Sequence, residues 1–130
     1  MLAALWLAGC AELGVAKCPV GLRLTPVAEM FFGRNIGGKE GVIYADWARF
    51  VDQEITPRFP AGLTVIDGQG QWRAADGVLV HERSKLVLIV LPRKDSDQNA
   101  QSIEAVRSAY KTRFHQESVM LIRRTACVEY

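Results

Sequence analysis

The run Leu86-Val87-Leu88-Ile89-Val90-Leu91 is apolar at every position and is followed by Pro92. A short run of aliphatic and β-branched residues is typical of a strand, and one without polar alternation is expected to be buried on both faces. The run ends a strand predicted over residues 78–91, which begins after the hairpin signal Asp76-Gly77. We therefore predict a central strand, around which the other elements are arranged.

Short apolar runs and amphipathic segments alternate on both sides of this strand. Apolar residues that recur every three or four positions indicate helices, and compact β-rich runs bounded by Gly or Pro indicate strands. Before the central strand, we predict a strand over residues 27–34, a helix over 43–55 and a strand over 63–73. After it, we predict a helix that Asp97 caps and that ends at Phe114, and then a last strand over 119–128.

This order of elements predicts an α+β, ferredoxin-like βαββαβ fold, with a four-stranded antiparallel sheet and two helices on one face. In that topology the first and last strands are antiparallel neighbours. Cys18 precedes the first strand and Cys127 ends the last, so the two residues are brought toward each other. We expect a Cys18–Cys127 disulfide in an oxidising compartment, whereas a cytoplasmic chain would keep two separate thiols.

The amino-terminal residues predict export and lipid attachment. Residues 2–7 form an apolar run too short to span a bilayer, and Leu7-Ala8-Gly9-Cys10 resembles a bacterial lipobox. We expect a signal peptide over residues 1–9, a lipidated Cys10 with a tether over 10–25, and one domain over 26–130 in the cell envelope. The first basic residue is Lys17, so either the true start lies upstream or the signal is weak.

Composition excludes several classes of function. The 130 residues include 16 basic and 14 acidic side chains, mixed along the chain, which does not give the basic stripe of a nucleic-acid-binding protein. His81 and His115 have no partners at metal-ligand spacing, so no metal site is predicted. Trp47 and Tyr110 lie at core spacing on the two predicted helices and are expected in the core. We predict no catalytic residue and no cofactor.

The predicted hairpin provides the candidate ligand site. With Ala74–Gly77 as its loop, residues that face each other across the two strands share one face of the sheet. This register gathers on one face Gln69, Gln71, Arg73 and Glu82. The ladder could hold a small polar ligand, or it could be the solvated face of an exposed arm. With Trp72 from the opposite face and Arg58, the predicted ligand-binding residues are Arg58, Gln69, Gln71, Trp72, Arg73 and Glu82.

Five segments, in this order along the chain, resemble a bacterial family of small exported proteins and lipoproteins of unknown function: Glu29–Arg34, Thr56–Val65, Gly70–Arg73, Glu82–Lys85 and Tyr110–Val119. The resemblance covers residues 26–128 and implies a location and a domain type, without a catalytic residue. Within the second segment, Arg58 could pair with Glu54 or Glu82, or bind an anion.

Two functions are compatible with these observations. The first is a non-enzymatic, lipid-anchored envelope protein that acts as an interaction or small-ligand-binding module. The alternative is an enzyme or cofactor-binding protein that resembles the dimeric α/β barrel monooxygenases, a likeness of fold alone. An enclosed pocket with Arg58, Gln71, Trp72 or Glu82 would favour the alternative. The expected partner is the membrane, through the lipid anchor, and a homodimer is left open.

Overall fold

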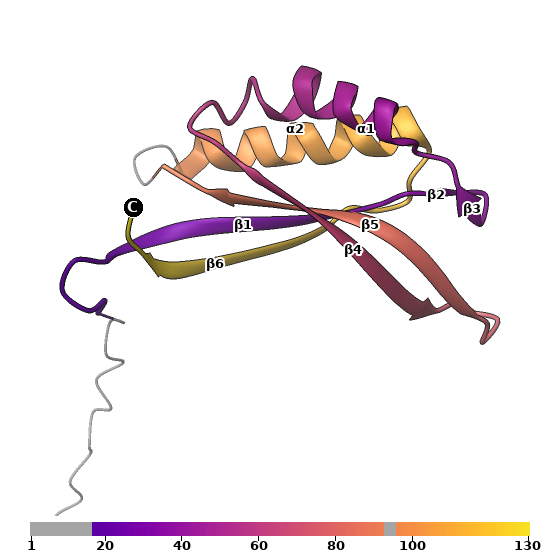
Figure 1. The fold of residues 1–130 in the computed structure, drawn as a ribbon, viewed down its shortest axis with the longest axis horizontal. Coiled ribbons are helices and arrows are strands. Elements are labelled where there is room, and N and C mark those ends of the chain that lie inside the picture. The colour runs from indigo at the N-terminus through magenta and orange to yellow at the C-terminus, as the bar shows by residue number, and fades with distance from the viewer. Residues whose placement is uncertain (1–16, 93–95) are drawn as a thin grey trace, which may run out of the picture.

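The apolar run 86–91 lies at the end of strand β5 (Leu79–Val90), inside a four-stranded antiparallel sheet (Figure 1). The computed structural model of the chain describes residues 17–92 and 96–130. β5 pairs with β4 (Thr64–Arg73) on one side and with β1 (Arg23–Gly33) on the other. β6 (Met120–Val128) pairs with β1 at the far edge. The predicted central position of this strand is confirmed, as is the ferredoxin-like α+β fold.

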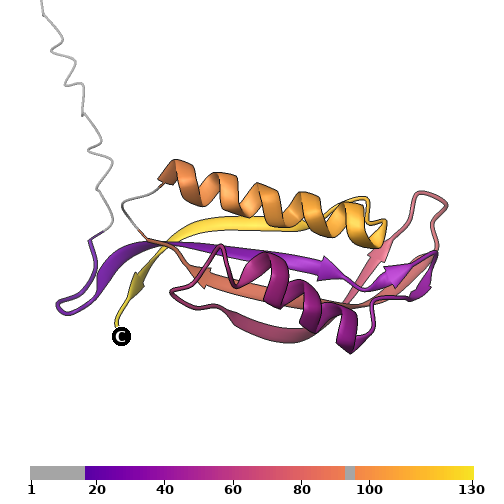
Figure 2. The same cartoon turned by 90° about the horizontal axis from the view of Figure 1, so that it is seen from above.

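Both helices lie on one side of the sheet (Figures 1 and 2). The first, α1 (Tyr44–Phe50), continues into a π-helical turn, η1 (Val51–Ile55), and the second, α2, covers Ser96–Phe114. Against the sheet they bury an aromatic cluster of Phe32, Trp47, Phe50, Tyr110 and Phe114, in which most rings meet edge to face. The predicted core positions of Trp47 and Tyr110 are therefore confirmed. No helix in the described residues is long and apolar enough to span a membrane.

The prediction that the run 86–91 is buried on both faces is wrong for the described chain. Val87, Ile89 and Leu91 are buried under the helices. The alternate residues Leu86 and Leu88 are only half-buried, because they point to the face that no described helix covers. One face of the sheet thus keeps apolar side chains in contact with solvent.

A small hairpin after β1 is the element that the sequence did not predict. Its strands are β2 (Asn35–Ile36) and β3 (Lys39–Glu40), and Gly37 and Gly38 turn between them with φ of 58° and 81°. Such positive φ values favour glycine, because a Cβ would crowd the backbone. The expected turn at these glycines is present, and it extends into a paired segment.

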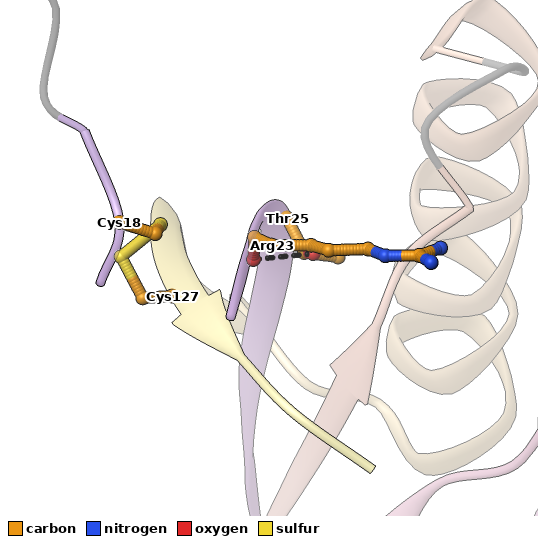
Figure 3. Close-up of a disulfide and its surroundings, with 4 residues drawn as sticks. All are labelled: Cys18, Arg23, Thr25 and Cys127. Atoms are coloured by element: carbon orange, nitrogen blue, oxygen red, sulfur yellow. Dashed lines mark hydrogen bonds between the residues drawn. A yellow bond between two sulfur atoms is a disulfide. The ribbon is translucent and has the colours of Figure 1, made fainter. Parts of the chain in front are cut away.

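Cys18 and Cys127 form a disulfide, with their Cα atoms 5.5 Å apart (Figure 3). A turn closed by the Leu22 N–H and the Pro19 carbonyl leads the chain from Cys18 into β1. Cys127 lies near the end of β6, opposite Leu24 of β1. The predicted pairing is confirmed, and the bond ties the start of the first large strand to the end of the last.

Removing this disulfide is expected to destabilise the domain. The bond closes a loop across 109 residues, and in the chain-entropy model such a loop contributes on the order of 4 kcal/mol. Urea unfolding of a Cys18→Ala, Cys127→Ala variant should show a lower midpoint than the oxidised protein at unchanged slope. Reductant should lower the midpoint of the wild type and leave that of the variant unchanged. Equal midpoints for the variant and the oxidised wild type would contradict a stabilising bond.

Candidate functional site

A polar hollow of about 570 Å³ lies where β4 and β5 extend past the end of β1, beside the β2–β3 hairpin. The extended strands form a two-stranded arm, visible in Figure 1 where β4 and β5 continue beyond β1 and β6. The side chains and backbone that line the hollow belong to Asn35, Gly38, Glu40, Gln69, Gly70, Gln71, His81, Glu82 and Arg83. Its volume is in the range of sites for small ligands.

Arg34 fastens the hairpin that forms one wall of the hollow. Its side chain is buried, its Nε–H donates to the Val42 carbonyl at 2.9 Å, and its guanidinium contacts the Glu40 carboxylate at 2.5 Å. The Arg34 carbonyl accepts hydrogen bonds from the N–H groups of Gly41 and Val42. A buried charge of this kind requires such a partner, so the Arg34–Glu40 pair fixes the position of β3.

Glu82 connects the arm to the start of the hairpin. Its carboxylate accepts a hydrogen bond from the Asn35 backbone N–H at 2.9 Å, and the Asn35 side chain donates to the His81 carbonyl at 3.2 Å. A Cβ on Gly33 would come within 2.5 Å of the same carboxylate, so glycine at this position leaves the space that Glu82 occupies. Glu82 therefore holds the wall of the hollow in place.

The predicted register of the hairpin is wrong by one residue. Arg73 lies opposite Leu79, Gln71 opposite His81, and Gln69 opposite Arg83. The loop contains one residue fewer than predicted: the Ala74 N–H donates to the Val78 carbonyl, so the loop is residues 75–77, and Gly77 within it has a φ of 86°. A one-residue shift moves a side chain to the other face of a sheet.

This shift separates the predicted ladder. Gln69, Gln71 and Arg73 share a face with His81 and Arg83, and the predicted fourth member, Glu82, is on the opposite face. Neither Gly68 nor Gly70 interrupts the pairing with a bulge. A Cβ on Gly68 would lie 2.9 Å from the Ser84 hydroxyl oxygen, so this glycine permits a close approach of the two strands.

Three of the predicted ligand-binding residues line the hollow, namely Gln69, Gln71 and Glu82. The other three do not. Arg58 lies in the turn after η1 and pairs with Glu54 at 2.9 Å. Arg73 lies near the tip of the arm, where it donates to the Gly77 carbonyl. Trp72 is on the opposite face of β4 from Arg73. The residues that the sequence analysis missed include Asn35, Glu40, His81 and Arg83. The glycine pair 37–38 was the only signal for the first two.

Glu40 forms ion pairs with two arginines, Arg34 and Arg83, and the unequal distances determine the charge that the hollow presents. Its carboxylate lies 2.5 Å from Arg34 but 3.7 Å from Arg83. The buried Arg34 takes the close contact, while the Arg83 side chain is 65% exposed. Arg83 therefore brings a positive charge to the hollow that its acidic neighbour compensates only loosely. The amides of Gln69 and Gln71 beside it can both donate and accept hydrogen bonds.

A second charged pair adjoins the hollow on the same face. The Lys85 ammonium is almost fully buried and lies 2.5 Å from the Asp67 carboxylate, which is exposed. This hydrogen bond, followed by the charges of Lys85, Arg34 and Arg83, holds the pKa of Asp67 below its ordinary value of 3.8. Within residues 17–92 and 96–130, no three His, Cys, Asp or Glu side chains gather as metal ligands.

The geometry defines a ferredoxin-like α+β domain with a polar hollow at one end of its sheet. Residues 27–130 match the family model described as "Protein of unknown function (DUF3574)", and the chain belongs to that family. This membership agrees with the expected resemblance to a family without an assigned activity. No curated protein sequence matches the chain.

Solved structures with a similar fold have low sequence identity. A phage SAM lyase in complex with S-methyl-5'-thioadenosine superposes with a TM-score of 0.63 at 18% identity, over 88% of this chain and 95% of that one. The apo form of a phage SAM lyase gives a TM-score of 0.59 at 20% identity, over 90% and 97% of the two chains. CutA from Synechococcus elongatus gives 0.51 at 7% identity, over 80% and 78%. These similarities show the fold alone.

Removing the Lys85 charge is expected to raise the pKa of the Asp67 carboxyl toward 3.8, because the largest cause of its depression is lost. A ¹³C NMR titration of the side-chain carboxyl should show this change in Lys85→Met. Lys17→Met, which removes a lysine charge before β1, should leave the Asp67 titration as in the wild type. An unchanged pKa in Lys85→Met would contradict the pairing.

The same pair implies a pH dependence of stability. Folding lowers the pKa of Asp67, so the ionised carboxylate adds to the free energy of unfolding. This stabilisation is fully present above pH 3.8, the ordinary pKa of the group, and is lost as the pH falls through the lower pKa of the folded state.

Proposed function

We propose that the chain is a lipid-anchored cell-envelope protein whose domain binds a small polar ligand with an anionic group in the hollow. The observation that carries this proposal is the position of Arg83, whose side chain is 65% exposed and whose guanidinium is 3.7 Å from the only carboxylate it contacts among the described residues. An incoming carboxylate or phosphate can approach that guanidinium and form charge-assisted hydrogen bonds.

The other groups around Arg83 favour a ligand that also carries hydroxyl or amide groups. Gln69, Gln71 and Asn35 present side-chain amides, and His81 adds an imidazole. Such groups recognise hydrogen-bonding partners and contribute little apolar contact area. We therefore expect a compact, hydrophilic ligand in preference to a large aromatic one.

The enzymatic alternative has less support from the geometry. The hollow contains Gln71 and Glu82, but it is open to solvent and not enclosed, and Arg58 and Trp72 lie outside it. Glu82 is engaged by the Asn35 backbone N–H. A carboxylate held in this way supports the wall of the site. The phage SAM lyase that shares the fold was solved with S-methyl-5'-thioadenosine, so this nucleoside is a suitable probe for the alternative.

The location in the envelope is proposed from sequence. The lipobox-like segment Leu7-Ala8-Gly9-Cys10 lies outside the described residues. The Cys18–Cys127 disulfide supports the proposal, because disulfides persist mainly in oxidising compartments. Two or three acyl chains at Cys10 would anchor the chain stably, whereas one acyl chain binds membranes reversibly.

Ligand binding can be tested by NMR titration with three probes: succinate, glucose 6-phosphate and S-methyl-5'-thioadenosine. We expect an anionic probe to shift the backbone amides around Gln69, Gln71 and Arg83. Arg83→Met should weaken that binding by about tenfold or more, the cost of losing a hydrogen bond to a charged group. Arg73→Met is the matched control, because Arg73 is on the same face but outside the hollow, and it should bind normally.

Two outcomes would contradict the ligand proposal. Equal losses in Arg83→Met and Arg73→Met would show that binding depends on general charge. Shifts caused by S-methyl-5'-thioadenosine but by neither anion would favour the alternative.

Lipidation can be tested on protein made in a bacterial envelope. Intact mass spectrometry should show cleavage before Cys10 and the added mass of the acyl groups. Cys10→Ser should lack both changes and should leave the membrane fraction. A wild-type protein without an acyl mass would overturn the proposed anchor and leave the ligand site untouched.

A further inference from the structure

We propose that the uncovered face of the sheet is the interface with a second copy of this chain. This face carries large apolar side chains in solvent: Ile66 is 47% exposed, Met120 54% and Ile122 40%. Contiguous exposed apolar surface of this kind is rare on monomers and marks sites of association.

The register places these side chains in continuous rows across the strands. One row runs from β4 through β5 and β1 to β6 and consists of Ile66, Leu86, Phe31 and Met120. The next row consists of Thr64, Leu88, Glu29 and Ile122. Antiparallel sheets that face water alternate between apolar and polar residues, and the second half of β5, from Leu86 onward, does not. The sequence of this half of β5 therefore fits a strand that is covered on both sides.

The size of the face suits a dimer. Four strands about 4.8 Å apart, each about nine residues long at about 3.3 Å per residue, cover on the order of 600 Å² of flat area. Side chains add relief to this plane, and a standard interface buries about 800 Å² on each partner. The open face of the sheet is therefore close in area to the surface that each partner of a standard dimer buries.

The charges on the face favour a second copy over a charged partner. In these two rows the charged residue is Glu29, and its carboxylate accepts hydrogen bonds from Arg124, including one of 2.5 Å. The centre of the patch is thus electrically balanced. In a two-fold dimer the same patch meets itself, so each balanced, apolar surface receives an identical one without repulsion.

Sedimentation velocity on the full chain carrying Cys10→Ser, with the disulfide formed, tests the interface. We expect a dimer in the micromolar range. Ile66→Glu and Ile122→Glu each place a charge in the patch and should weaken the dimer by about tenfold or more. Leu79→Glu is the matched control: its side chain is 45% exposed on the opposite face of the arm, and the dimer should persist.

Both side chains are exposed, so the glutamate variants should keep the wild-type circular dichroism spectrum. A wild-type chain that stays monomeric at high micromolar concentration would overturn the proposal. It would also be overturned if both glutamate variants dimerised as tightly as Leu79→Glu. Monomers that bind phosphatidylglycerol vesicles through this face would assign it to a membrane, against the proposal.

Discussion

A four-stranded sheet has two faces, and the helices of this chain lie on the same one (Figures 1 and 2). The arrangement follows from the order of elements, since each helix connects two strands that both belong to one sheet. The aromatic cluster under α1 and α2 fills the covered side. The other side keeps Ile66, Met120 and Ile122 in solvent, and the sequence provides no described element to cover them.

The ends of the sheet are fixed by different means. At one end the Cys18–Cys127 bond joins the start of β1 to the end of β6 (Figure 3), where Thr25 also donates to the Arg23 carbonyl at 2.9 Å. At the other end, the buried Arg34 and its partner Glu40 fix the β2–β3 hairpin, and Asn35 joins this hairpin to Glu82 and His81 of the arm. The disulfide involves no charged groups. At the other end, Glu40 pairs closely with Arg34, so the second arginine near it, Arg83, lies 3.7 Å from the same carboxylate. The proposed ligand site is a consequence of this second way of fixing an end.

The sequence predicts the features that depend on local pattern. The apolar run 86–91, the helical spacing after residue 43 and the glycine at 77 were sufficient for the element order, and that order brings Cys18 to Cys127. The register of the arm depends on a loop of three residues instead of four, and Asp76-Gly77 does not specify that length. Lys85 pairs with Asp67 on a neighbouring strand, so its burial could not be derived from the sequence nearby. Arg34 contacts Glu40 and Val42, which are close in sequence, but only because the unpredicted β2–β3 hairpin brings them together. Three of six predicted ligand-binding residues therefore line the hollow.

In the proposed dimer, the apolar rows of the sheet meet the same rows of a second copy. Isotope-filtered NOE spectra detect this contact in a mixed sample where one population of chains carries ¹³C-labelled Ile and Met methyl groups and the other is unlabelled. We expect intermolecular NOEs to the methyl groups of Ile66, Met120 and Ile122. Intermolecular NOEs confined to residues outside these rows, or an absence of any at concentrations where the chain is folded, would contradict it.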